Sequence, residues 1–223
     1  DHFSPVAPAY ADSRPAYPAA LFDWLASMCA AHDLAWDCGA GSGQASTALA
    51  SRFRRVIATD ASAEQIAHAA AHPNVEYRLA AAERSGLDAA CADLVTVAQA
   101  LHWFDLDRFW PEVRRVARRE ALFAAWTYGP LQIEGAEANA LIQGFRADIA
   151  SWWPEGRRHV ENGYRELSFP FARLEAPAFA IETPWSVDRL LGYPRSWSSV
   201  PRFRQSQAVD PVQAIEAPLR GAW

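Results

Sequence analysis

Lysine is absent from this sequence of 223 residues, because all 21 of its lysine-or-arginine positions are arginine. The absence excludes a phosphate-loop lysine, a lysine Schiff base and any lysine nucleophile. We attribute it to a genome rich in G and C rather than to selection for a particular chemistry.

Cysteine and long apolar runs are also scarce. Cys29, Cys38 and Cys91 lie far apart without a CxxC pair, so the sequence predicts reduced thiols and neither a disulfide framework nor a metal site. No apolar run approaches the roughly 20 residues of a membrane-spanning helix. The first residues, DHFSPVAPAYADSRPAYP, are polar and proline-rich, unlike a secretory signal. We therefore expect a cytoplasmic protein with no membrane partner.

The sequence also carries no excess of positive charge. The formal net charge is -5, and non-specific binding of DNA or RNA needs a basic surface, so we expect no nucleic-acid partner. A hydrophobic fraction of 51% in 223 residues is enough for one sizeable core and little for two. We expect one domain, and the composition does not distinguish a monomer from a homodimer.

The first half of the chain alternates between strand and helix patterns. Apolar runs of strand length fall at 34–38, 55–60, 75–80, 92–100 and 121–128. Helical patterns fall at 43–53, 62–71 and 107–119, and Ser62 is placed to cap the second of them. Continuously apolar strands that alternate with helices are typical of a parallel sheet covered on both faces. The predicted fold is therefore α/β, with a Rossmann-like, doubly wound and mostly parallel sheet.

The regular alternation ends after Gly129. An amphipathic stretch over 134–153 and an aromatic, proline-rich region follow, and FAIETPW (residues 179–185) is a candidate late strand. We expect seven strands, the last in doubt because no strand pattern follows Val212, and a helical, aromatic cap inserted after the fifth strand. The expected parts are an N-terminal lid over 1–20, a cofactor-binding core over 21–129, and the cap with the sheet edge over 130–223.

The stretch LAWDCGAGSGQAS places three alternate glycines directly after the first apolar run. Gly39, Gly41 and Gly43 allow a tight turn and a close approach to a ligand at the carboxyl end of a strand. A dinucleotide-binding loop, G-x-G-x-x-G, would need its third glycine at position 44, where Gln44 stands. Asp60, at the end of the second run, suits the two hydroxyls of a ribose. Together these residues predict a ligand that contains adenosine.

The spacing acidic-x-G-x-G-x-G resembles the first motif of the class I S-adenosylmethionine-dependent methyltransferases. The chain is similar to their type 11 branch, and within it to the trans-aconitate methyltransferase-like group. The similarity covers nearly the whole length, through DCGAGSG, ATDAS, AAAE, VAQALHWFD, YRELSFPF and LGYPRSWSS. The resemblance implies S-adenosyl-L-methionine as cofactor and methyl transfer to a small molecule as activity.

The resemblance also implies roles for individual residues. It places Asp37, Gly39, Ala40, Gly41, Gln44 and Gln99 around the methionine portion of the cofactor, Asp60 and Ala61 at the ribose, and Ala81, Ala82 and Glu83 along the adenine. Many relatives have an aspartate where Ala81 stands, so adenine recognition would fall to backbone groups or to Glu83. Tyr10, Arg14 and Tyr17 are expected in a lid in which Arg14 binds the cofactor carboxylate, with a frayed tail as the alternative.

Methyl transfer from a sulfonium is an in-line displacement, which depends on alignment and exclusion of water. A carboxylate acceptor arrives deprotonated, whereas a phenol or amine would need a base, for which His102 is the candidate. A structural histidine packed beside Trp103 is the alternative. Candidates for the substrate pocket are Trp103, Tyr128, Trp152, Tyr164, Arg165 and Trp197. Arg165, together with Arg195, could bind an acidic substrate, although aromatic residues also fill cores and arginines also occupy surfaces.

Two other functions fit the same loop. A nicotinamide-dependent oxidoreductase is disfavoured by Gln44 and by the lack of a Tyr-x-x-x-Lys pair, which a chain without lysine cannot have. A catalytically silent protein that binds an adenosyl cofactor would keep the fold without turnover.

Overall fold

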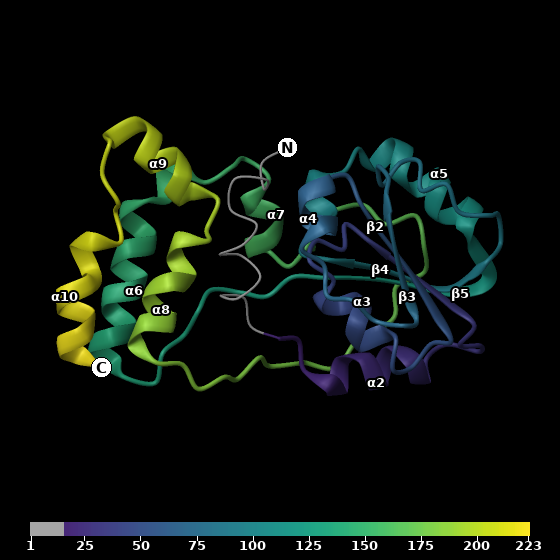
Figure 1. Ribbon diagram of the computed structural model, residues 1–223, viewed down its shortest axis with the longest axis horizontal. Helices are drawn as coiled ribbons and strands as arrows, with labels where there is room; N and C mark the ends of the chain where they lie inside the picture. Colours follow the sequence, from purple (N-terminus) through teal and green to yellow (C-terminus); the bar gives the residue numbers. More distant parts are fainter. Residues whose placement is uncertain (1–15) are drawn as a thin grey trace.

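The computed structural model describes residues 16–223, so the predicted roles of Tyr10 and Arg14 lie outside the described residues. Five strands form one sheet in the order β3-β2-β1-β4-β5 (Figure 1). Their bounds are Leu34–Cys38 (β1), Arg55–Asp60 (β2), Val75–Leu79 (β3), Ala92–Ala98 (β4) and Ala117–Trp126 (β5). Every neighbouring pair is parallel, which confirms the predicted α/β, doubly wound architecture.

The strand order reverses between β1 and β4. The chain runs outward from β1 to β3 and then returns to place β4 on the other side of β1, where Ala35 pairs with both Val56 and Leu94. At such a switch point the loops after two adjacent strands diverge and leave a crevice at their carboxyl ends. The glycine loop after β1 and the loop after β4 therefore border one crevice.

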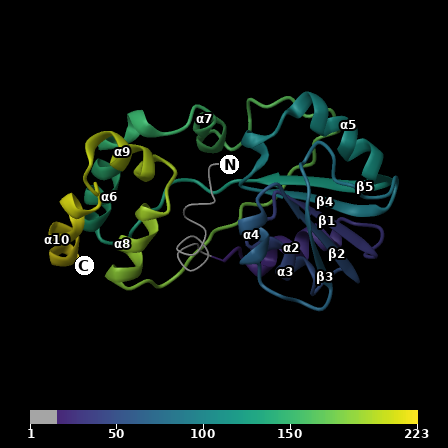
Figure 2. The same cartoon turned by 45° about the horizontal axis from the view of Figure 1, so that its top comes forward.

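Successive residues of each strand face opposite layers of helices, because side chains alternate along a strand. Ala35 packs with Leu25 of α2 (Ala19–Ser27) and with α3 (Gln44–Leu49), while Trp36 packs with Phe109 of α5 (Leu106–Val116) on the other face. Figure 2 shows α5 on one side of the sheet and α2 and α3 on the other. The short α4 (Ala63–Ala67) begins with the predicted cap, since the Ser62 hydroxyl accepts a hydrogen bond from the Gln65 amide.

The second half of the chain builds a separate group of helices beyond the carboxyl ends of the strands (Figure 1). They are α6 (Ala136–Asp148), α8 (Val187–Arg195), α9 (Ser199–Gln207) and α10 (Gln213–Ala222), which we call the helical part. Ile142, Leu190 and Leu219 are buried at its centre. The turn η3 (Ala150–Trp152) and α7 (Arg157–Glu161) lead back toward the sheet, where α7 contacts the turn η2 (Leu101–Trp103). Within residues 16–223, no helix is both long and apolar enough to span a membrane.

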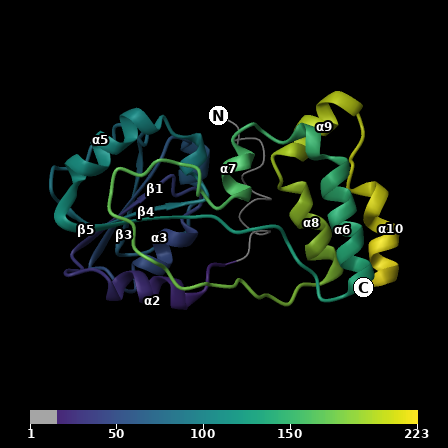
Figure 3. The same cartoon turned by 180° about the vertical axis from the view of Figure 1, so that it is seen from behind.

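The predicted late strand is wrong, because FAIETPW forms no strand and the described sheet has five strands rather than seven. The segment 165–186 instead crosses the outside of the sheet near β5 (Figure 3). The rings of Phe169 and Phe171 pack on Trp110 and Phe123, and the ring of Phe179 packs on Trp24. Pro177 and Pro184 lack the amide hydrogens that a strand would donate. After Val212 the chain forms α10 instead of an edge strand.

The predicted helix over 107–119 extends beyond the C-terminal end of the observed helix. Helix α5 stops at Val116, and β5 begins at Ala117, which pairs with Ala92 of β4. Arg118 therefore belongs to the strand, where its guanidinium group binds the carboxylates of Asp93 and Asp33. Arg118 thus ties the beginning of β5 to β4 and to the residue before β1, whereas Arg114 and Arg115 lie in the last turn of α5.

Candidate functional site

The three glycines after β1 adopt left-handed backbone conformations, with φ angles of +68°, +55° and +84° at Gly39, Gly41 and Gly43. A side chain at Gly39 would place its Cβ 2.6 Å from the Cβ of Ala100, and one at Gly43 would collide with the Tyr77 ring. The missing side chains of Gly39 and Gly43 therefore leave room for Ala100 and Tyr77, at two positions where we expected a ligand to approach. The positive φ angles still require glycine for the turn itself.

Asp60 is fixed at the tip of β2 facing the glycine loop. Its carboxylate accepts hydrogen bonds from the amides of Gly41 and Ser62, each at 2.8 Å. A carboxylate has about four acceptor positions, so these two bonds leave acceptor capacity on the half-buried side chain. The neighbouring Ala61 is exposed.

Asp37, the acidic residue of the motif, lies beneath the loop and is fully buried. The hydroxyls of Ser46 and Thr96 donate to its carboxylate at 2.6 and 2.8 Å. Burial, only partly offset by these donors, raises the pKa of Asp37 to about 6. Asp37 therefore joins β1 to α3 and β4, and it does not lie on the open side of the loop.

The loop after β3 is tied to the beginning of α5. The Glu83 carboxylate accepts a hydrogen bond from the Asp105 amide at 2.9 Å, Ala82 is buried and Ala81 is exposed. Ala40 and Gln44 are half-buried on the glycine loop and at the first residue of α3. The structure thus gathers the predicted cofactor residues 37–44, 60–61 and 81–83 around the carboxyl ends of β1, β2 and β3.

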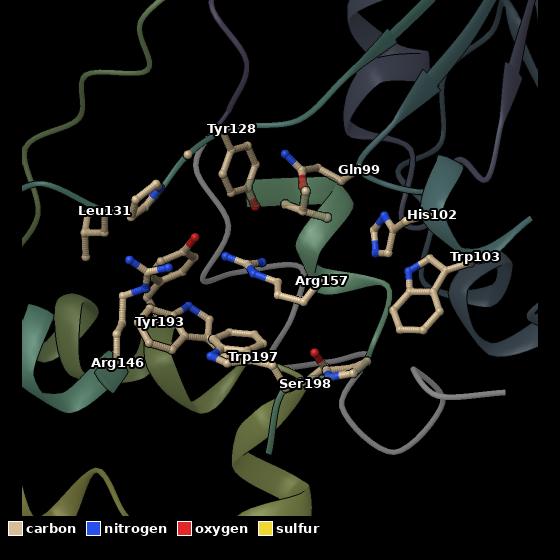
Figure 4. Close-up of a pocket in the computed structure, with 15 residues that line it drawn as sticks. Gln99, His102, Trp103, Tyr128, Leu131, Arg146, Arg157, Tyr193, Trp197 and Ser198 are labelled. Carbon is tan, nitrogen blue, oxygen red and sulfur yellow. The ribbon is translucent and has the colours of Figure 1, made fainter. Parts of the chain in front are cut away.

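A cavity of about 60 Å³ lies between the sheet and the helical part (Figure 4). Its sheet side consists of predicted site residues, namely Gln99, His102, Trp103 and Tyr128. Its helical side includes Arg146, Trp153, Arg157, Tyr193 and Trp197. A larger and more open cavity of about 440 Å³ lies behind the first one, and Arg146, Trp153, Pro154 and Arg157 border both.

Two arginines that the sequence reasoning did not single out point into the smaller cavity, as Figure 4 shows. The guanidinium groups of Arg146 and Arg157 lie 3.3 and 3.6 Å from the carboxylate of Glu161. Arg157 also lies over the Trp153 ring at 4.4 Å. A usable signal for Arg157 was the run WWPEGRR, in which aromatic residues lie near arginines.

The arginines that we expected at the pocket lie elsewhere. Arg165 is exposed and is not among the residues that border the cavity. Arg195 is bound to Asp210 and Glu216 inside the helical part. Trp152 packs on Phe203, with ring centres 4.6 Å apart, and does not border the cavity either.

Gln99 ends β4 with an unusual backbone conformation, at a φ of +58°. Its side-chain oxygen accepts a hydrogen bond from the Thr127 hydroxyl at 3.3 Å. Its side-chain nitrogen is buried and has no hydrogen-bond partner among the described residues. A buried amide without a partner is costly, and it suits a ligand with an acceptor atom.

His102 lies on the cavity wall with its ring 4.7 Å from that of Trp103. Its Nδ1 is 3.1 Å from the hydroxyl oxygen of Tyr164, which is buried behind the wall. Burial, followed by the positive charges of Arg157 and His159, lowers the pKa of His102 to about 4. The ring is therefore neutral near pH 7.

Comparison with known proteins places these features in a family. Residues 36–125 match a family described as a methyltransferase domain. A Dictyostelium discoideum protein named as a methyltransferase is 32% identical over 227 residues, which cover 100% of this chain and 86% of that protein.

Solved structures agree. A protein of Anaeromyxobacter dehalogenans, named as a type II methyltransferase, is 49% identical with a TM-score of 0.87, covering 94% of this chain and 89% of that one. A protein named as a methyltransferase of an antibiotic biosynthesis pathway in Anabaena variabilis is 21% identical with a TM-score of 0.61, covering 95% and 90%, and shows the shared fold.

Proposed function

This chain belongs to the class I S-adenosylmethionine-dependent methyltransferases, and we propose that its acceptor is a small molecule that presents a carboxylate to the cavity beside His102. The observation that carries the proposal is the set of hydrogen-bond donors that meet there. The guanidinium groups of Arg146 and Arg157 and the buried amide nitrogen of Gln99 all border one small cavity. The two guanidinium groups share the one carboxylate of Glu161, so a net positive charge remains beside the cavity, and such a charge suits an anion.

The residues around the glycine loop fit S-adenosyl-L-methionine. Asp60 keeps acceptor positions for the ribose hydroxyls, and its hydrogen bonds to Gly41 and Ser62 hold it in place. We assign the loop 39–44 and the backbone of Gln99 to the methionine portion, and the loop 81–83 to the adenine. When bound, the cofactor supplies a methyl group on a positively charged sulfur.

The size and walls of the cavity support a small acceptor group. A volume of about 60 Å³ admits only a few non-hydrogen atoms. The rings of Trp153 and Trp197 line its helical side, and charged hydrogen bonds are stronger where apolar groups displace water. The protein would therefore act by holding the carboxylate in line and dry rather than by moving a proton.

His102 is poorly suited to serve as a base. A general base works best when its pKa lies near the working pH, whereas the pKa of His102 is lowered to about 4. A carboxylate acceptor needs no base because it is already ionised. This match between acceptor and site favours a carboxylate over a phenol or an amine.

The proposal is tested by methyl transfer from labelled S-adenosylmethionine to pairs of small acids and their uncharged amides, with phenols and amines as further arms. We expect label in at least one acid and in none of the amides. Arg157→Gln and Arg146→Gln should each raise the KM for that acid about 10- to 100-fold, because each removes a charged hydrogen bond.

Cofactor binding provides the control for these variants. Calorimetry should give the same affinity for S-adenosylhomocysteine in the two arginine variants as in the unmodified protein. Asp60→Ala should weaken that affinity by roughly 2 to 4 kcal/mol. Transfer to a phenol or amine alone would refute the carboxylate acceptor, and cofactor binding without any transfer would support the silent binding protein instead.

The three free cysteines support the cytoplasmic location that we propose for this protein. The division into a lid, a cofactor-binding core and a cap stays a prediction.

A further inference from the structure

Tyr164 lies directly behind the cavity wall formed by His102. It follows α7, is buried, and has a φ of +60°, which is uncommon for a residue with a large side chain. Its amide donates a hydrogen bond to the carbonyl of His159 at 2.8 Å, which holds this turn. A strained residue of this kind persists only where the surroundings keep it in place. The Tyr164 hydroxyl is thereby fixed 3.1 Å from Nδ1 of His102.

The surroundings of the Tyr164 oxygen decide which atom carries the shared hydrogen. The hydroxyl is buried, and Nδ1 of His102 is its one hydrogen-bond partner among the described residues. A buried hydroxyl hydrogen needs an acceptor, so it is directed to His102 Nδ1, which accepts it. A neutral imidazole carries one hydrogen, so a ring that accepts at Nδ1 carries its own hydrogen on Nε2.

Packing limits how the His102 ring can turn. The ring stacks beside Trp103, and Gly156 lies so close that a Cβ there would be 3.4 Å from the Cδ2 atom of His102. Cδ2 is bonded to Nε2, so the missing side chain of Gly156 leaves room next to the nitrogen that is not tied to Tyr164. The ring is flanked by Trp103 and, on its Nδ1 side, by Tyr164.

We propose that Tyr164 is a positioning residue that keeps His102 in the Nε2–H tautomer, so that the ring donates a hydrogen bond to the carboxylate of the acceptor. This role rests on the proposed acceptor, and it adds a donor to those of Arg146, Arg157 and Gln99. His102 then binds the acceptor and does not take its proton. Tyr164 acts through His102 and does not touch the acceptor.

The tautomer is measured by long-range proton–nitrogen NMR of the nitrogen-labelled full chain. His102 is identified by the signal that disappears in His102→Asn. We expect the unmodified protein to show hydrogen on Nε2 and a bare Nδ1, and Tyr164→Phe to show a detectable Nδ1–H form. Tyr128→Phe removes another hydroxyl beside the same cavity and should leave the tautomer unchanged. Hydrogen on Nδ1 in the unmodified protein, or an unchanged spectrum in Tyr164→Phe, overturns the proposal.

The donor role is measured with acetate as a carboxylate probe and methyl acetate as its uncharged counterpart. Acetate should shift the His102 Nε2 signal at constant ionic strength, and methyl acetate should not. An Nε2 signal that is insensitive to acetate overturns the donor role. The NMR results stand apart from turnover, because the tautomer and acetate shifts can be present even if no acid is methylated. In that case the proposed function fails and the positioning of His102 stands.

Discussion

Asp37 shows how a single buried carboxylate can connect three elements at the carboxyl end of a sheet. Its two hydroxyl partners come from α3 and β4, so one side chain joins the glycine loop to both. Two hydrogen bonds stabilise the charge less than burial destabilises it, and the pKa rises. The ionised form therefore lowers the stability of the folded protein.

Asp37→Asn should remove the pH dependence of folding stability that this carboxylate causes. A carboxyl with a raised pKa stabilises the fold fully below its unfolded pKa of 3.8 and loses that contribution as the pH rises through about 6. The free energy of unfolding of the variant, relative to the unmodified protein, should thus increase across this window by about 3 kcal/mol. Urea unfolding at a series of pH values measures it, and a difference that is constant with pH would contradict the assignment.

At the scale of elements, Glu112 of α5 holds the loop that follows β3. The amide and hydroxyl of Ser85 donate to its carboxylate at 2.8 and 2.6 Å, and Arg115 forms an ion pair with it. Hydrogen bonds from Arg115 and Ser85 lower the pKa of Glu112 to about 2. The loop 81–86, which carries the proposed adenine contacts, is therefore anchored to α5.

Glu112→Gln should cost about 1 to 3 kcal/mol of unfolding free energy above pH 4.5, because the ion pair and part of the acceptor capacity are lost. A lowered pKa stabilises the fold above the unfolded value of 4.5, and that contribution disappears as the pH falls through about 2. The two proteins should therefore converge in acid. Arg115→Gln, at a half-exposed side chain, should cost less than about 1 kcal/mol. Equal costs for the two variants in urea unfolding would argue against Glu112 as the anchor.

At the scale of the whole molecule, the buried residues separate into a sheet side and the helical part. Two clusters cover the two faces of the sheet, and a third fills the helical part and contains no residue of the sheet. The smaller cavity lies where the two meet. The cofactor loops belong wholly to the sheet side, while the two arginines of the cavity come from α6 and α7.

This division predicts that a cavity-forming substitution in the helical part and one in the sheet will have different effects on cofactor binding. Ile142→Ala in the helical part and Leu94→Ala in the sheet should each lower the unfolding free energy by about 2 to 5 kcal/mol, since both residues are fully buried. Ile142→Ala should keep the affinity for S-adenosylhomocysteine and lose methyl transfer, whereas Leu94→Ala should weaken both. Calorimetry and the transfer assay measure these effects. Loss of cofactor binding in Ile142→Ala would show that the two parts depend on each other.

The parts of the fold that local pattern determines were predictable. The strands over 34–38 and 55–60 agree with the sequence pattern to the residue, because each is a short apolar run bounded by a turn. FAIETPW has the same apolar character, yet its Phe179 packs on Trp24 of α2, and its Pro184 cannot donate a hydrogen bond to a neighbouring strand. Pattern alone does not distinguish burial against a helix from pairing in a sheet.

The candidate site was predictable on its sheet side, where Gln99 and His102 follow directly from the end of a strand. Its helical side was not, because Arg146 and Arg157 approach Gln99 from elements about 50 residues further along the chain. On their own helices they read as ordinary solvent-facing arginines. Such long-range proximity comes from packing between distant segments, and apart from the run WWPEGRR around Arg157 it leaves no local signal in the sequence.

The wall shared by the two cavities has a practical consequence for redesign. Arg146, Trp153, Pro154 and Arg157 border the narrow hollow on one side and the broad one on the other. A substitution of one of these residues that enlarges one cavity also removes part of the wall of the other. The volumes of the two cavities therefore cannot be engineered independently.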